Sequence, residues 1–486
     1  MFTGLTHHRT VVPALLLGVV GCAGSGTRHE TTDVFASTPT QTVVHADDWQ
    51  PAGVDRPHDQ IQLAHQEQLM APAIDGNSAV DGESLESLVA AALAANQRLQ
   101  QLRHEADAAW EKIRYADALP DPTVGANIFE DPIETAAGSL RANLTVSQMI
   151  PWLHRLQAQE EQAAYEAMAL YQLWRAERLK TTAEVKAVYY RLYVIGQELL
   201  ATESNRVLVK GIVGRAVSLT RQPGVGSAGD VTLGNLALSR LEESRVMLEA
   251  KRDMATARLN RLLDRPADAP VNMPTELLVD YEPWSFEGLR QLALERQPEI
   301  AAAQLQAHAT TWGVEVAALR ARPDVAFSFG WQFIDDNRPP SNVVNVGQDA
   351  WSLGSTVTVP LWHEKNSAVR DEAVRRHYAA HAATEDLINR YEERLLKLLA
   401  EATSASETAS LYKETMLGQA EQTLETDSTS YSQGRVEFGR VIDDTRALLD
   451  LQVDYHRALG RLAETIARLE QAVASDLTPA AEAGPF

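Results

Sequence analysis

Cysteine and long apolar segments are almost absent from this sequence. Its 486 residues include one cysteine, Cys22, which excludes a disulfide within the chain and a metal site built from several thiolates. Beyond that residue no run of about eighteen apolar residues occurs, so no membrane-spanning helix is expected there. Acidic residues outnumber basic ones and the net charge is −22, which argues against a nucleic-acid partner, because such a partner needs a basic face.

The motifs of common enzyme classes are missing as well. There is no Walker phosphate loop, no HExxH, no G-x-S-x-G and no candidate cysteine nucleophile. We therefore predict no catalytic residues, no cofactor and no bound metal. His377, His381 and Glu385 share one helix face at a spacing that could hold a metal, but on a helix this polar a solvated face is the better interpretation.

The N-terminus predicts export and lipidation. Arg9 precedes an apolar stretch over 11–20 that is too short to span a bilayer but suits a secretory signal. The stretch ends in Val-Val-Gly before Cys22 and resembles a lipobox. We expect a signal peptide over 1–21 and a lipid, such as palmitate, on Cys22. Ala23, which is not an aspartate, implies sorting to the outer membrane.

The rest of the sequence contains an internal duplication. A first set of residues recurs about 201 positions later and a second set about 210 positions later, which indicates one architectural unit used twice. The pairs include Leu85 with Phe286, Ala92 with Ala293, Pro120-Asp121 with Pro323-Asp324, and Ala257-Arg258-Leu259 with Ala467-Arg468-Leu469. We assign the first repeat to 84–283 and the second to 284–474. An irregular segment over 22–83 precedes them and a tail over 475–486 follows.

Each repeat is predicted to contain two strands. Val325, Phe327, Phe329, Trp331 and Phe333 alternate with small or polar residues, and the same period of two occurs over 351–359, 140–147 and, more weakly, 123–129. A strand needs this pattern to face lipid on one side and water on the other. A soluble sandwich alternates in the same way and is the alternative. The linkers between paired strands are expected over 130–138 and 334–349.

Four strands cannot close a barrel, and open sheet edges are not tolerated in lipid. If the strands enter a membrane, several chains must therefore share one barrel. Three chains would supply about twelve strands, an even number within the usual range. The fold class that we expect is mainly α-helical with a small membrane β part.

Helices of unusual length surround the strands. An amphipathic helix opens each repeat, over 84–119 and 286–321, and long helices without proline follow the strands over 152–220 and 361–430. At 1.5 Å per residue each long helix extends about 100 Å. Glycine-containing turns and return helices, to about residues 263 and 473, complete two antiparallel hairpins.

With these motifs in order, the sequence resembles the TolC family of outer-membrane efflux factors over about residues 84–474. The motifs that carry the resemblance are Ala-Leu-Pro-Asp-Pro over 118–122, Ser-Gln-Met-Ile-Pro-Trp over 147–152, Val-Thr-Val-Pro-Leu over 357–361, and Tyr431 with Gly434 leading to Asp443.

The resemblance implies a homotrimer in which a twelve-stranded outer-membrane β-barrel continues into a periplasmic α-helical barrel. Such a trimer is the exit duct for an inner-membrane pump, of the resistance-nodulation-division type, and a periplasmic adaptor protein. The strand-to-helix junctions resemble those of members that export metal cations. Ducts for drugs, organic solutes or secreted proteins share the fold, and a lipid-anchored coiled-coil stalk without transport is the structural alternative.

The family also implies a periplasmic gate near the hairpin tips, with acids six and nine residues after a tip glycine. After Gly434 these positions are Arg440 and Asp443, followed by Asp444; after Gly224 they are Asp230 and Leu233. We expect Asp443, Asp444 and Asp230 to form rings of charge and Arg440 to pair with an acid and lock the closed state. The alternative is that these acids only stabilise helix N-termini.

The tips are also expected to contact the adaptor. The residues concerned are Gly224, Val225 and Gly226 in the first hairpin and Gly434, Arg435 and Val436 in the second. Glycine also serves simply to make a turn, and the two roles are compatible.

Overall fold

The computed structural model describes residues 84–221, 227–277, 279, 281–336 and 344–477. Cys22 and the tip residues Gly224, Val225 and Gly226 lie outside these ranges, as do residues 1–83 and the end of the tail. All described residues belong to one compact unit. No helix among them is long and apolar enough to cross a membrane.

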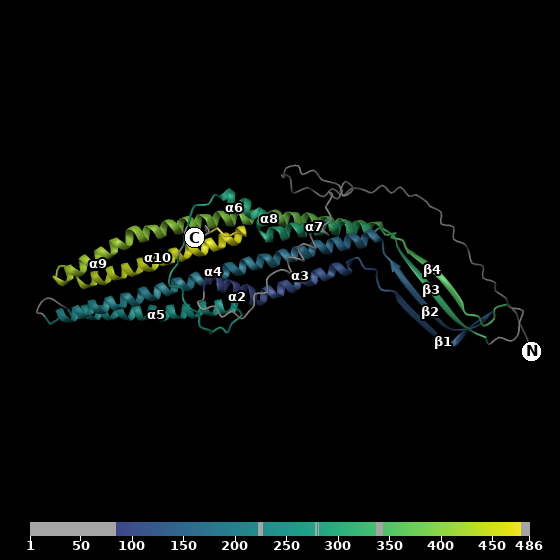
Figure 1. Ribbon diagram of the computed structural model, residues 1–486, viewed down its shortest axis with the longest axis horizontal. Helices are drawn as coiled ribbons and strands as arrows, with labels where there is room; N and C mark the ends of the chain where they lie inside the picture. The colour runs from purple at the N-terminus through teal and green to yellow at the C-terminus, as the bar shows by residue number, and fades with distance from the viewer. Residues whose placement is uncertain (1–83, 222–226, 278, 280, 337–343, 478–486) are drawn as a thin grey trace, which may run out of the picture. The chain divides into compact units, whose positions relative to one another are not determined.

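The same order of elements occurs twice along the described chain (Figure 1). The first series is α2 (Leu85–Ala95), α3 (Gln97–Ala116), β1 (Thr123–Thr135), β2 (Gly138–Ile150), α4 (Leu153–Leu219) and α5 (Ala228–Leu262). The second is α6 (Phe286–Arg296), α7 (Pro298–Leu319), β3 (Asp324–Asp335), β4 (Ala350–Thr358), α8 (His363–Leu411), α9 (Leu417–Ser432) and α10 (Phe438–Val473). The predicted strands and hairpins are confirmed.

The prediction of one continuous helix at the start of each repeat is wrong. The first breaks at Asn96, whose side-chain oxygen accepts hydrogen bonds from the backbone N–H groups of Arg98 and Leu99 at 2.9 and 3.3 Å. It therefore ends α2 and caps α3. The second breaks at Gln297, because the residue before a proline, here Pro298, is disfavoured in the α conformation.

Two other predicted boundaries also change. The linker expected over 130–138 is much shorter, because β1 continues to Thr135 and pairs with Gly138 across a tight turn. The long helix expected over 361–430 is interrupted by a π-helical turn at Tyr412–Met416. A π turn inserts one residue into the helical ladder and re-aims the helix that follows.

The four strands form one antiparallel sheet in the order β1-β2-β3-β4. Strands β2 and β3, which belong to different repeats, pair along most of their lengths, from Ser139 with Asp335 to Ile150 with Val325. The central contact of the sheet is thus between the two repeats. Among the described strands, β1 and β4 each pair on one side only, so both edges of this sheet are open in that part of the chain.

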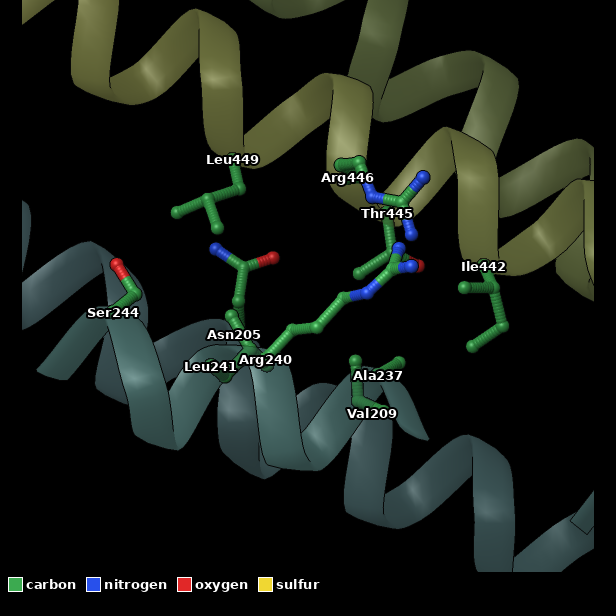
Figure 2. Close-up of a pocket in the computed structure, with 10 residues that line it drawn as sticks. All are labelled: Asn205, Val209, Ala237, Arg240, Leu241, Ser244, Ile442, Thr445, Arg446 and Leu449. Atoms are coloured by element: carbon green, nitrogen blue, oxygen red, sulfur yellow. The ribbon is translucent and has the colours of Figure 1, made fainter. Parts of the chain in front are cut away.

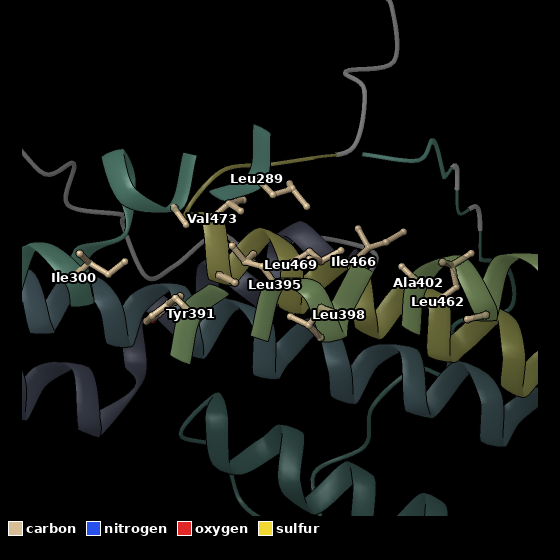
Figure 3. Packing of buried hydrophobic residues seen from close by; sticks show 13 residues of the cluster. Leu289, Ile300, Tyr391, Leu395, Leu398, Ala402, Leu462, Ile466, Leu469 and Val473 are labelled. Atoms are coloured by element: carbon tan, nitrogen blue, oxygen red, sulfur yellow. The ribbon is translucent and has the colours of Figure 1, made fainter. Parts of the chain in front are cut away.

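The helical core lies where α10 packs against its neighbours. One buried cluster joins α6, α7, α8 and α10 and includes Ile300, Leu395, Ile466 and Leu469 (Figure 3). Two ion pairs join α4 and α10: Lys186 with Glu470 and Arg457 with Glu198, both at 2.6 Å. In each pair the carboxylate is buried, whereas the Arg457 side chain is 47% exposed. These contacts hold the second hairpin on the first.

The contact between α4 and α10 depends on Gly460. A Cβ atom at this position would lie 2.3 Å from Cγ2 of Val194 on α4, a separation that forces the helices apart. Gly418 on α9 differs, because a Cβ there would meet no atom within 4 Å. The two glycines therefore form a matched pair.

We predict that Gly460→Ala lowers the melting temperature, because overpacking a close contact costs about 1–3 kcal/mol. Gly418→Ala should leave it unchanged or raise it, since alanine favours a helix over glycine by up to ~1 kcal/mol. Thermal melts followed by circular dichroism measure both. Equal melting temperatures for the two variants would mean that this helix contact does not limit stability.

Candidate functional site

One face of the sheet is apolar and exposed. Side chains in register make continuous rows across all four strands: Val124, Val146, Phe329 and Leu353 form one row, and Ala126, Leu144, Trp331 and Trp351 the next. Phe329 is 40% exposed, Leu353 74% and Trp351 66%. Rows of exposed aromatic and branched side chains of this extent mark a surface that contacts lipid or another protein.

The other face is small and polar. Its rows contain Gly125, Thr145, Gly330 and Ser352, and then Asn127, Asn143 and Gln332. A soluble sandwich would need a second sheet on the apolar face, but the described strands pair only with one another in a single sheet. The apolar face is thus left uncovered by the described part of the chain.

Charged and aromatic side chains fix the junction between sheet and helices. Asp324, at the start of β3, accepts hydrogen bonds from the guanidinium of Arg155 at 2.9 Å and from the backbone N–H of Trp152 at 3.1 Å. Gln148 donates to the carbonyl of Pro120 at 2.7 Å. The Pro-Asp motif of the second repeat, through Asp324, therefore meets the Ile-Pro-Trp motif of the first, and Gln148 joins β2 to the Pro-Asp motif of the first repeat.

The described hairpin tip is a tight turn between α9 and α10. Gly434 has φ of +70°, a conformation that glycine adopts without strain. Its N–H donates to the carbonyl of Tyr431 at 2.9 Å, and the N–H of Arg435 donates to that of Ser430 at 3.0 Å. The Tyr431 and Phe438 rings pack edge to face across the turn. Arg435 and Val436 lie at its apex.

Arg440 forms the ion pair that the sequence predicts, but its partner is Asp427 on α9. The Arg440 Nε and the Asp427 Oδ2 are 2.6 Å apart, and Asp427 is only 8% exposed. Sequence reasoning missed Asp427. The signal that could have found it is an acid on the outgoing helix, seven residues before the tip glycine, opposite a basic residue on the return helix.

The two aspartates of α10 face different surroundings. Asp443 is exposed and lies 3.4 Å from Arg446. The carboxyl group of Asp444 turns toward that of Asp427. Apart from this carboxyl pair, the buried Oδ2 of Asp444 has no hydrogen-bond partner among the described residues. Burial raises the pKa of Asp444, and the neighbouring Asp427 raises it further. The hydrogen bond from Arg440 lowers the pKa of Asp427. We call Asp427, Arg440 and Asp444 the tip latch.

Asp230, the remaining predicted gate residue, is partly buried in the first turn of α5, where the helix dipole favours an acid. Burial raises the pKa of the Tyr431 hydroxyl, and the nearby Asp230 carboxylate raises it further. Asp230 therefore lies near the second tip although it belongs to the first hairpin.

The histidines of α8 do not assemble a metal site. The rings of His377 and His381 are 4.5 Å apart, and His377 shares a 3.2 Å hydrogen bond with Thr310 on α7. Among the residues that the structure describes, no group of three or more potential ligands is close enough to hold an ion. Burial lowers the pKa of His377, which keeps its ring neutral near pH 7.

Comparisons with known proteins agree with this geometry. Residues 289–475, from α6 to the end of α10, match the sequence model of a family described as outer membrane efflux protein. Residues 289–475 therefore belong to the outer membrane efflux protein family. No curated protein matches the chain.

Solved structures extend the likeness over most of the chain. The outer-membrane channel OprN has a TM-score of 0.68 at 19% identity and covers 81% of this chain and 91% of its own. VceC, an outer membrane protein of Vibrio cholerae, has a TM-score of 0.69 at 17% identity, and the match covers 80% of this chain and 96% of VceC. CusC has a TM-score of 0.67 at 17% identity, and the match covers 80% of this chain and 92% of CusC. At these identities the likeness establishes the fold.

The tip latch generates a prediction with opposite signs for its two acids. The low pKa of Asp427 means that its stabilising contact is present at neutral pH and is lost as the pH falls through that pKa. The raised pKa of Asp444 means that its contribution to the stability of the folded tip is present at low pH and is lost as the pH rises through that pKa. Hence Asp427→Asn should speed amide exchange around residues 430–441, and Asp444→Asn should slow it at about pH 7.

Hydrogen exchange followed by mass spectrometry measures both effects. As the pH is lowered from about 7 toward the raised pKa of Asp444, the exchange of the wild-type tip, corrected for intrinsic rates, should approach that of Asp444→Asn. Asp443→Asn is the control and should leave the tip unchanged. If Asp444→Asn and the wild type have equal protection at every pH, the acids of the latch do not share a proton.

Proposed function

We propose that the protein is the outer-membrane exit duct of an efflux system, through which substrate passes from the periplasm to the exterior. The single observation that supports this most is the sheet, with one exposed apolar face, one polar face and two open edges. It is joined through short junctions to helices such as α4, whose 67 residues extend about 100 Å.

The proposed assembly is a homotrimer. In lipid every backbone group must be paired within the protein, so the free edges of β1 and β4 need partners. These two strands run antiparallel to each other within one copy, so β4 of one copy can pair with β1 of the next and keep the barrel antiparallel throughout. Three copies give a closed barrel of about twelve strands, continuous with a barrel of helices.

The repeated order of elements supports the proposed division into repeats over 84–283 and 284–474, with a tail over 475–486. For residues 1–21 we propose a signal peptide, and for 22–83 a segment that follows a lipid on Cys22. The lipid, with the barrel, would hold the protein in the outer membrane. Labelled palmitate should be incorporated by the wild type; equal labelling of Cys22→Ser would exclude this anchor.

The proposed partners are a periplasmic adaptor at the tips and, beyond it, an inner-membrane pump of the resistance-nodulation-division type. Gly434, Arg435 and Val436 form the exposed turn that we assign to adaptor contact, together with Gly224, Val225 and Gly226 of the first hairpin. The substrates that we propose are metal cations. The junction sequences and the acidic balance of the chain, at −22, support this choice.

A matched pair of substitutions tests the membrane assignment. Phe329 lies on the apolar face and Ser328, next to it, on the polar face. We predict that Phe329→Arg abolishes insertion into planar bilayers, because arginine on a lipid face costs about 2–4 kcal/mol per chain near the midplane. Ser328→Arg should still insert and should shift ion selectivity toward anions, because it adds positive charge to the water-filled interior.

Single-channel recording of the purified protein gives the readout. The wild type should form discrete channels and run as a trimer after detergent extraction. A water-soluble monomer without conductance would favour the stalk alternative. If Ser328→Arg fails to insert and Phe329→Arg inserts normally, the two faces are assigned the wrong way round.

We further propose that the tip latch is part of the periplasmic gate, with exposed Asp443 and partly buried Asp230 as the acids around it. Removing the ion pair should loosen closure, so Arg440→Ala and Asp427→Asn should each raise conductance. Asp443→Ala should instead weaken block by divalent cations, because it removes exposed charge. If conductance is the same in Arg440→Ala and the wild type, the constriction lies elsewhere.

A further inference from the structure

A crevice separates the two hairpins of one copy, away from the tip latch. Its volume is about 160 Å³, and its lining comes from α4, α5 and α10 (Figure 2). The residues are Asn205, Val209, Ala237, Arg240, Leu241, Ser244, Ile442, Thr445, Arg446 and Leu449. The efflux assignment does not use it, and of the acids proposed for the gate Asp443 contacts a lining residue, Arg446, at 3.4 Å.

The floor of the crevice is apolar. Val209 and Ile442 are buried, and Ala237, Leu241 and Leu449 complete the surface. An apolar cavity of about 150 Å³ holds a molecule the size of benzene. The crevice therefore has the size and lining for one aromatic ring.

Two arginines border this floor. Arg240 extends from α5 toward α10, and Arg446 of α10 lines the same crevice (Figure 2). In the described part of the chain Arg240 makes no ion pair, and Arg446 has only a long contact of 3.4 Å with exposed Asp443. Two neighbouring guanidinium groups repel each other unless an anion lies between them.

A shortage of acidic residues does not explain why Arg240 makes no ion pair with a described residue. Arg245, on the same helix, pairs with Glu242 and Glu249 at 2.6 Å each. Arg240 thus differs from Arg245 in making no ion pair with a described residue, and Arg446 keeps one contact, with exposed Asp443 at 3.4 Å. Both guanidinium groups can therefore turn donors toward an anion in the crevice.

A second polar group in the crevice is also unsatisfied. Asn205 is 4% exposed; its Nδ2 donates to the carbonyl of Ala201 at 2.9 Å, but its buried Oδ1 has no hydrogen-bond partner. A buried acceptor without a donor costs stability. A carboxylate has no proton to give this acceptor, so what the crevice offers such a ligand is its ring-sized apolar floor and the guanidinium groups at its border.

We propose that this crevice binds a small aromatic carboxylate, with its ring on the apolar floor and its carboxylate between Arg240 and Arg446. Guanidinium groups recognise carboxylates through paired, charge-assisted hydrogen bonds. The ligand joins α5 to α10, two helices that otherwise touch only slightly, and so stiffens the contact between the hairpins.

The test measures binding of 4-fluorobenzoate to the full-length protein in nonionic detergent by fluorine NMR. The wild type should bind the probe and release it to unlabelled benzoate. Arg240→Gln and Arg446→Gln should each weaken binding about tenfold, the loss expected for one charge-assisted hydrogen bond. Ala237→Leu should abolish binding by filling the floor, without any change of charge.

Two controls decide the outcome. Arg245→Gln removes a paired arginine from the same helix and should leave the affinity unchanged, and 4-fluorobenzylamine, which has the same ring with a positive charge, should not bind. Absence of binding to the wild type, equal binding of the amine, or equal losses in Arg240→Gln and Arg245→Gln would each overturn the proposal. Because the readout is binding and not conductance, failure here leaves the proposed function standing.

Discussion

The unpaired backbone along the outer edges of β1 and β4 is the constraint on which the rest of the structure depends. A sheet edge presents N–H and C=O groups that water can satisfy and lipid cannot. The exposed aromatic rows of the same sheet call for an apolar environment. Both demands are met together only if the edges pair with other copies, which makes assembly a condition for membrane insertion in the proposed function.

Such a sheet needs firm attachment to its helices, and the pairing of β2 with β3 provides it. This pairing joins the two repeats at the sheet, while Asp324 of the second repeat holds Arg155 of the first at the junction. Farther along the helices, the ion pairs of Lys186 with buried Glu470 and of Arg457 with buried Glu198 join the repeats again. Removing either cation leaves a buried carboxylate without its partner, so these contacts favour one alignment of α10 on α4.

The ends of the hairpins use charge differently. In the tip latch an arginine is held by a buried carboxylate, whereas in the crevice two arginines stand without one. The first arrangement is complete within the chain and suits a contact that holds a closed state. In the second, Arg240 has no ion-pair partner among the described residues and Arg446 contacts exposed Asp443, an arrangement that suits a ligand. The two sites lie on the same helix, α10, which contributes Arg440 to one and Arg446 to the other.

The sequence by itself determined the type and order of the elements, because strand alternation and uninterrupted helix depend on near neighbours. The period of two in β3 and the absence of proline from α4 are visible without a structure. Helix breaks at Asn96 and Gln297 were also local events, and capping and proline rules could have found them. The sequence also indicated that Arg440 would have an acidic partner.

Only the tertiary structure decided which acid that partner is, since Asp427 reaches Arg440 through the geometry of the hairpin. It also decided the pairing of β2 with β3 and the crevice between Arg240 and Arg446, whose residues lie on helices about two hundred positions apart. Contacts of this kind depend on how helices dock, and many docking geometries are compatible with one pattern of apolar residues. Local periodicity therefore specifies the elements, and packing selects which side chains meet.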